Sequence, residues 1–124
     1  MLDTKITRLQ RFWLDFLRKI TPLLMTFFLT TFWMHIQNAS NYYGLDAAYM
    51  TRVAKCESRL NPNAVSSNNL YHGGYQYSWR TWVSFSRQAG FAGASPYDPE
   101  AAAYVTAWAF AHGYASHWPR CRWS

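Results

Sequence analysis

Apolar side chains follow a helical period in two stretches at the start of the chain. The first is amphipathic, with basic residues between the apolar positions Leu2, Ile6, Leu9, Phe12, Trp13, Phe16 and Leu17. This pattern is typical of a helix that lies on an anionic membrane surface. The second stretch, residues 20–36, is mostly apolar, and no residue from Ile20 to Leu45 is formally charged. It is the candidate for insertion into a membrane.

The 20–36 segment allows three interpretations. A full membrane span needs about 20 apolar residues, and this segment is shorter and includes Pro22 and four threonines. It fits a signal-peptide core or a short signal anchor, and a buried helix is the alternative. The preceding basic residues place the N-terminus in the cytoplasm and residues after about 40 outside. Because no clear cleavage site surrounds Ala39, we favour an anchor over a cleaved signal.

Residues 41–124 are expected to form one extracytoplasmic domain, secreted or membrane-anchored, after the 1–40 leader with its signal peptide or signal anchor. Residues 38–44 resemble a linker. Ser78 and Asp98 are candidate N-caps, and Asn, Pro and Gly in residues 59–78 indicate a loop or a short β-hairpin. Helices are expected over residues 46–58, 79–89 and 99–112. The fold class is therefore mainly α: a small helical domain preceded by an amphipathic and hydrophobic N-terminal helix.

Composition adds an excess of aromatic residues and a positive charge. Seven Trp, nine Tyr and eight Phe exceed what so small a core can bury, so some rings should line a groove where sugar rings can stack. Each individual ring is still more often a core residue. The net charge of +6 favours anionic partners such as acidic lipid or cell-wall polymer. Nucleic acid is a poorer candidate, because the arginines are scattered along the chain.

Only two cysteines occur, Cys56 and Cys121. In an exported small domain such a pair usually forms a disulfide, and closing a loop of about 66 residues would stabilise the fold by roughly 4 kcal/mol. Metal binding or two free thiols are the alternatives, and no cluster of ligands at metal spacing supports the first. Cys56 falls on the apolar face of the 46–58 helix, so we expect it to face the core.

Glu57 is one of only two glutamates, and it falls near the end of the same helix. A carboxyl at that place, beside a cysteine and among aromatic residues, is partly desolvated, and desolvation raises its pKa. An acid of this kind can hold a proton near neutral pH and donate it to a glycosidic oxygen. The alternative is a surface glutamate paired with Arg52, Lys55 or Arg59.

Three blocks in residues 45–124 resemble the soluble lytic transglycosylase superfamily, in the same order. The block ESRLNPNAVS (57–66) is similar to its Glu-Ser opening. The block GGYQYSWRTW (73–82) resembles its Gly-Gly-Leu-Gln-Phe…Thr-Trp segment, especially in the resuscitation-promoting-factor branch. The block AHGYASHWPRCRWS (111–124) is similar to the ending of that branch.

The resemblance implies an α+β lysozyme-like fold that cleaves the β-1,4 bond between N-acetylmuramic acid and N-acetylglucosamine in peptidoglycan, without a cofactor or metal. Glu57 would be the catalytic acid and then the base, and Cys56 would be bridged to Cys121. The residues expected to bind substrate are Ser66, Gln76, Thr81, Tyr75, Tyr77 and His112. Each has an ordinary alternative. Ser66 would be a turn serine, Gln76 a polar residue that satisfies backbone groups, and Thr81 a threonine near a helix cap. Tyr75 and Tyr77 would be core tyrosines, and His112 a histidine at a helix end.

The chain also departs from that branch. His112 stands where the branch has a glutamine, and Tyr114 replaces a tryptophan. Both changes affect substrate contacts and leave the acid itself untouched.

The carboxylates restrict the mechanism. A two-carboxylate glycosidase holds its second carboxyl about 5–9 Å from the acid. Asp98 and Glu100 are explained by a helix start, and Asp46 lies about 16 Å from Glu57 along one helix at 1.5 Å per residue. The carboxylate count therefore favours a single-acid reaction, with either 1,6-anhydro ends or hydrolysis by water as the outcome. The resemblance to lytic transglycosylases implies the anhydro ends.

The expected partners are peptidoglycan glycan strands and, through the N-terminal segment, a membrane. Nucleic acid is not expected, and the protein is expected to be a monomer. A membrane-anchored module that binds cell-wall glycan without cleaving it is the alternative function.

Overall fold

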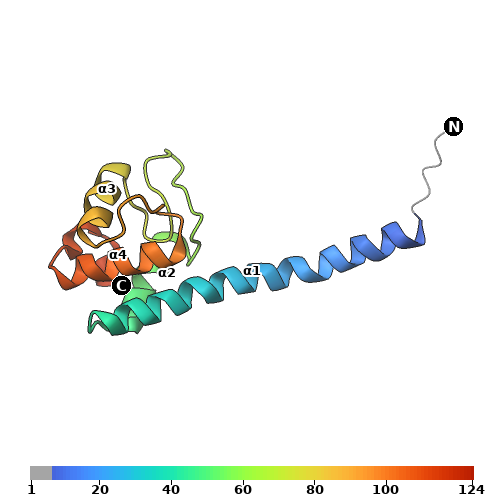
Figure 1. Ribbon diagram of the computed structural model, residues 1–124, viewed down its shortest axis with the longest axis horizontal. Helices are drawn as coiled ribbons and strands as arrows, with labels where there is room; N and C mark the ends of the chain where they lie inside the picture. Colours follow the sequence, from blue (N-terminus) through green and yellow to red (C-terminus); the bar gives the residue numbers. More distant parts are fainter. Residues whose placement is uncertain (1–6) are drawn as a thin grey trace.

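The computed structural model describes the backbone of residues 7–124 and the side chains of residues 7–23 and 31–124. Leu2 and Ile6, which begin the amphipathic pattern, lie outside the described residues. One long helix extends away from a cluster that contains all the other elements (Figure 1). The long helix is α1 (Arg8–Tyr42). The other elements are α2 (Ala47–Ser58), α3 (Trp79–Gln88), α4 (Pro99–Ala111) and the short 3-10 helices η1 (Ala115–His117) and η2 (Cys121–Trp123). The prediction of a mainly helical chain is confirmed.

The long helix α1 begins at a capping box. The Thr7 hydroxyl accepts a hydrogen bond from the Gln10 backbone N–H, and the Gln10 side chain accepts one from the Thr7 backbone N–H. The helix then runs for 35 residues and includes Pro22. Among the described residues, no helix is both long enough and apolar enough to cross a membrane.

The last three turns of α1 belong to the globular core. Phe32, Ile36 and Ala39 are fully buried, and they pack in one cluster with α4, in which eight of the 13 residues are buried. In the described part of the 20–36 segment, Phe32 and Ile36 are thus buried as the buried-helix interpretation expects, whereas Trp33 and Met34 are exposed. The linker predicted over residues 38–44 is wrong, because burial of this face against α4 continues the helix to Tyr42.

The other three helices lie within one residue of their predicted bounds. Two starts are capped as expected, since Ser78 accepts from the Thr81 N–H and Asp98 from the Glu100 N–H. Asp46, which was expected to be the first residue of its helix, is its cap and accepts from the Ala48 N–H. Capping is decided by residues close in sequence, which explains why the pattern located these ends well.

The segment between α2 and α3 is an irregular loop. Instead of a regular hairpin, it contains the isolated antiparallel bridges Val65–His72 and His72–Tyr77. Four non-glycine residues in it have left-handed backbone angles, namely Arg59, Leu60, Asn69 and Gln76. These angles let the loop fold back on itself over a short length of chain.

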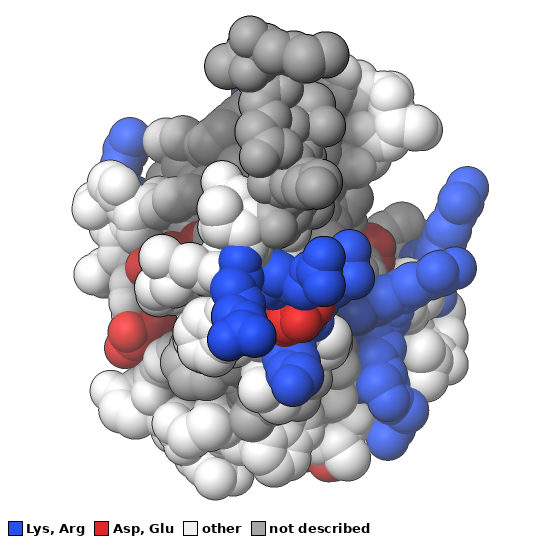
Figure 2. Space-filling view, turned by 90° about the vertical axis from the view of Figure 1, so that its right-hand side faces the viewer, with Lys and Arg blue, Asp and Glu red and all other residues white. Residues whose placement is uncertain are grey.

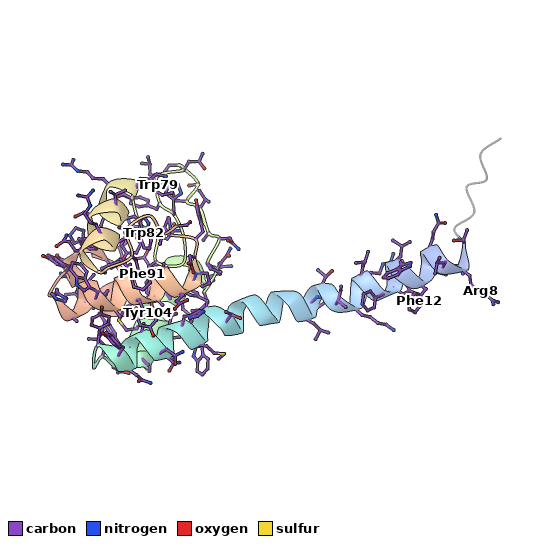
Figure 3. All side chains as sticks on the ribbon, in the orientation of Figure 1. Arg8, Phe12, Trp79, Trp82, Phe91 and Tyr104 are labelled. Atoms are coloured by element: carbon purple, nitrogen blue, oxygen red, sulfur yellow. A yellow bond between two sulfur atoms is a disulfide. The ribbon has the colours of Figure 1, made fainter. Side chains whose placement is uncertain are left out.

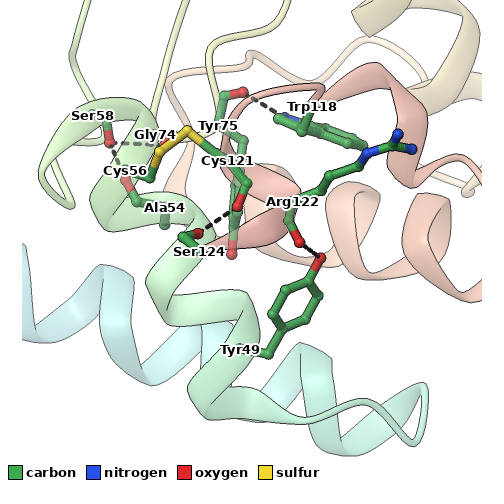
Figure 4. Close-up of a disulfide and its surroundings, with 10 residues drawn as sticks. All are labelled: Tyr49, Ala54, Cys56, Ser58, Gly74, Tyr75, Trp118, Cys121, Arg122 and Ser124. Carbon is green, nitrogen blue, oxygen red and sulfur yellow. Dashed lines mark hydrogen bonds between the residues drawn. A yellow bond between two sulfur atoms is a disulfide. The ribbon is translucent and has the colours of Figure 1, made fainter.

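A disulfide joins Cys56 of α2 to Cys121 in the C-terminal tail, with 5.6 Å between the Cα atoms (Figure 4). The predicted bridge is confirmed. The tail is also held by a hydrogen bond from the Trp118 indole N–H to the Tyr75 carbonyl. Cys121 is buried, but Cys56 is exposed. The expectation that Cys56 faces the core is wrong, because this cysteine lies on a wall of the cavity described next.

Candidate functional site

A groove runs between the end of α2, the loop before α3 and the C-terminal tail. Its larger part is a cavity of about 640 Å³, and its smaller part has about 230 Å³. The larger part is lined by Cys56, Glu57, Asn68, Tyr71, Gln76, His117, Trp118, Pro119, Arg120 and Cys121. The smaller part is lined by Tyr71, Gln76, Tyr77, Ser78, Thr81, His117 and Trp118. Four residues are common to both linings, so the two parts adjoin. The larger volume is typical of a ligand site.

Glu57 projects into the larger cavity from the last turn of α2. Its side chain is half-buried, and this burial raises the pKa of the carboxyl above its ordinary value. The positive charge of Arg120, which lines the same cavity, opposes the increase. Glu57 is also the one carboxylate in the described lining of the groove. The position thus combines what a proton donor needs: partial desolvation and access to a ligand.

Asp46 and Asp98 are occupied elsewhere, because both accept hydrogen bonds as helix caps. Neither belongs to the lining of either cavity. In the described part of the chain, no group of three or more His, Cys, Asp or Glu could hold a metal ion. Of the carboxylates in the described residues, Glu57 is therefore the one that the groove can use for acid–base chemistry.

Gln76 lies where the two parts of the groove meet. Its backbone is left-handed, with φ of 55°, which is uncommon for a residue with a Cβ. Its amide nitrogen donates to the carbonyls of Gly73, at 2.9 Å, and Ala64, at 3.3 Å. Since both amide hydrogens are used, Gln76 offers a ligand its Oε1 as an acceptor.

Thr81 lines the smaller cavity from the first turn of α3, together with Ser78. The Ser78 hydroxyl donates to the Thr81 hydroxyl, at 3.0 Å. The groove therefore contains four of the predicted catalytic and substrate-binding residues: Glu57 in its larger part, Thr81 and Tyr77 in its smaller part, and Gln76 in both.

Ser66 does not line either cavity. Its hydroxyl donates to the Asn68 side-chain oxygen, at 2.6 Å, and accepts from the Tyr71 backbone N–H, at 3.0 Å. Both partners line the groove, so Ser66 holds the loop that supplies them. This arrangement matches the alternative of a turn serine.

Tyr75 and Tyr77 are core residues. The Tyr75 hydroxyl donates to the Met50 carbonyl, and the Tyr77 hydroxyl shares a hydrogen bond with Thr106. Burial raises the pKa of both phenols. Tyr75 does not line the groove, and Tyr77 contributes a wall with its hydroxyl already bonded. The expectation that either hydroxyl binds substrate is wrong, because both are satisfied inside the protein.

His112 also lies outside both linings. Its ring stacks on Trp108, with 4.7 Å between the centroids, and its Nδ1 lies 2.7 Å from the Trp108 carbonyl oxygen. It follows the last turn of α4, as the alternative of a helix-end histidine predicts.

Asn68, Tyr71, His117, Trp118 and Arg120 complete the groove. Tyr71 and Trp118 are two of the rings that line the groove, in keeping with the expectation that part of the aromatic excess lies there. Asn68, His117 and Arg120 were missed. A signal for Arg120 was present, because it precedes Cys121, and the bridge to Cys56 brings Cys121 next to Glu57.

Searches against protein-family models, curated proteins and solved structures find no match to this chain.

Proposed function

We propose that this chain cleaves the β-1,4 bond between N-acetylmuramic acid and N-acetylglucosamine in peptidoglycan, with a lysozyme-like arrangement of its helices. The proposal rests above all on Glu57, a half-buried carboxyl with a raised pKa in an open groove. Two of the three sequence blocks that resemble lytic transglycosylases contribute Glu57, Gln76 and Thr81 to that groove, and the third contributes His117, Trp118 and Arg120. The protein then acts outside the cytoplasm, where its substrate lies.

In the proposed reaction, Glu57 donates its proton to the bridging oxygen while the bond from that oxygen to the muramic acid C1 breaks. The ionised Glu57 then takes the proton from the 6-hydroxyl of the same sugar, whose oxygen bonds to C1 and closes a 1,6-anhydro ring. Glu57 regains its proton, so the step needs no second carboxylate. This matches a groove whose one acid is Glu57. Attack by water in place of the 6-hydroxyl is the near variant.

The remaining lining residues suit a chain of sugars. Gln76 can accept a hydrogen bond from a hydroxyl or an acetamido N–H, and Asn68 is a second amide in the cavity. Tyr71, exposed over 44% of its surface, offers a ring on which a sugar face can stack. Arg120 can pair with a carboxylate of the substrate, and it also limits the increase in the Glu57 pKa.

The test is digestion of purified sacculi by the oxidised full-length chain, with release of muropeptides as the measurement. Glu57→Gln should abolish release, since an amide of the same shape cannot donate and recover the proton. Glu100→Gln, at the other glutamate in the chain, is the matched control, because Glu100 lies in the exposed first turn of α4. Undiminished release by Glu57→Gln would refute the proposal.

Mass spectrometry of the products then separates anhydro ends from hydrated ones. Binding to sacculi without any release, in the unsubstituted protein as well as in the variant, would support the non-catalytic glycan-binding module instead.

A further inference from the structure

The N-terminal half of α1 carries large apolar side chains that no other part of the described chain covers. Leu9 is 67% exposed and Phe12 62% exposed. Phe12 lies on α1 far from the aromatic residues of the domain (Figure 3). The exposed apolar residues in this half are Leu9, Phe12, Trp13, Leu14, Phe16, Leu17 and Leu23. A set of this size needs a partner.

These residues gather on one side of the helix. At about 100° per residue, all of them except Leu14 fall within an arc of about 140°. Within the arc, Trp13 contacts Phe12 and Phe16 edge-on, with 6.0 and 5.8 Å between the ring centroids. The charged residues lie outside this arc, and Leu14 lies beyond their other edge, about 40° from Arg18.

The charged side is basic. It carries Arg8, Arg11, Arg18 and Lys19 against the single acid Asp15, all of them exposed. Figure 2 looks along the molecule from the N-terminal end of α1, and basic side chains surround an acidic one near the viewer. A basic side opposite an aromatic and leucine-rich side is the pattern of helices that lie in a membrane interface.

We propose that residues 8–23 of α1 bind the surface of an anionic lipid bilayer, lying parallel to it with the apolar side in the acyl region. Two features favour a bilayer over a second copy of this helix. An apolar arc of about 140° is wider than the narrow seam of a coiled coil. A second copy would cover the apolar side but leave the basic side without an anionic partner, whereas acidic headgroups neutralise it.

The binding is independent of the proposed catalysis, because no residue of the groove takes part. The helix continues without interruption into the turns that contain the buried Phe32 and Ile36. A bilayer that holds the first turns of α1 therefore also holds the domain.

The experiment is co-sedimentation of the full-length chain with vesicles of phosphatidylcholine alone or mixed with phosphatidylglycerol. The mixed vesicles should bind more protein, and added salt should reduce the difference. Phe12→Ser combined with Phe16→Ser should lower the partition coefficient at least tenfold, by loss of apolar area. Leu14→Ser is the matched control, since it removes an exposed apolar residue from the other side and should change binding little.

Charge variants give an independent readout. Arg11→Gln and Arg18→Gln should each weaken binding to the mixed vesicles roughly fivefold, with little effect on neutral ones. Asp15→Asn should strengthen it. Equal effects of the Leu14 and Phe12/Phe16 substitutions would overturn the proposal. So would sedimentation equilibrium showing a stable oligomer that the Phe12/Phe16 substitutions dissociate, together with no vesicle binding by the unsubstituted chain.

Discussion

The burial of Phe32 predicts that the second half of α1 is indispensable to the fold. The ring is fully buried and meets Tyr75 edge-on, with 5.9 Å between the centroids. Replacing a fully buried phenylalanine by alanine costs about 3–5 kcal/mol of unfolding free energy. A domain of this size has about 5–15 kcal/mol in total. Phe32→Ala should therefore remove a large share of the stability.

The neighbouring residue provides the control. Trp33 follows on the same helix turn but is 46% exposed, so Trp33→Ala should change the unfolding free energy by about 0.5 kcal/mol or less. Urea unfolding of the oxidised protein, followed by near-ultraviolet circular dichroism, measures both values. Equal losses, or no loss for Phe32→Ala, would refute the inclusion of α1 in the core.

A double-mutant cycle with Gly74 tests the contact itself. A Cβ at Gly74 would overlap ring carbons of Phe32, so Gly74→Ala alone should cost about 1–3 kcal/mol through overpacking. In the Phe32→Ala background the added methyl enters the space that the ring has left, and the cost should disappear. Additive losses would show that the Phe32 ring does not contact position 74.

Three further predictions concern the groove. Because a general acid must be protonated, activity should decline as the pH rises through the raised pKa of Glu57. Arg120→Gln removes the charge that lowers this pKa, so it should move the decline to higher pH. A pH–rate profile measures both effects. Reduction of the disulfide, which spans a sequence separation of 65 residues, should lower the unfolding free energy by about 4 kcal/mol in the chain-entropy model, measured by urea unfolding with and without reductant. Ser66→Ala should cost about 1–2 kcal/mol by removing two hydrogen bonds, whereas the exposed Ser67→Ala should cost little in the same assay.

The elements that depend on local chemistry were predictable from the sequence. Ser78 and Asp98 cap the helices that they were expected to cap, since a cap is made by residues two or three positions away. The continuation of α1 to Tyr42 was not predictable in this way. The polar sequence at 38–44 resembles a linker, and only contact with α4, far along the chain, makes it helical.

The site residues that lie in continuous sequence blocks were predictable from the sequence. Glu57, Gln76 and Thr81 come from two continuous blocks and lie along one groove. Tyr75 was assigned wrongly because a motif specifies neighbours in sequence and does not say which side of the loop faces the interior. His117 and Arg120 belong to the tail, and their place beside Glu57 depends on a covalent bond between distant residues.

The Cys56–Cys121 disulfide makes the shape of the groove depend on whether the two cysteines are oxidised. Cys56 precedes Glu57, and Cys121 follows Arg120, so the sulfur bridge fastens one wall of the groove beside the acid. In a chain with free thiols, packing and hydrogen bonds alone would hold that wall beside Glu57. Under the proposed function, such a chain would be a less active precursor, and formation of the bridge in an oxidising compartment would complete the groove much as cleavage completes the site of a zymogen.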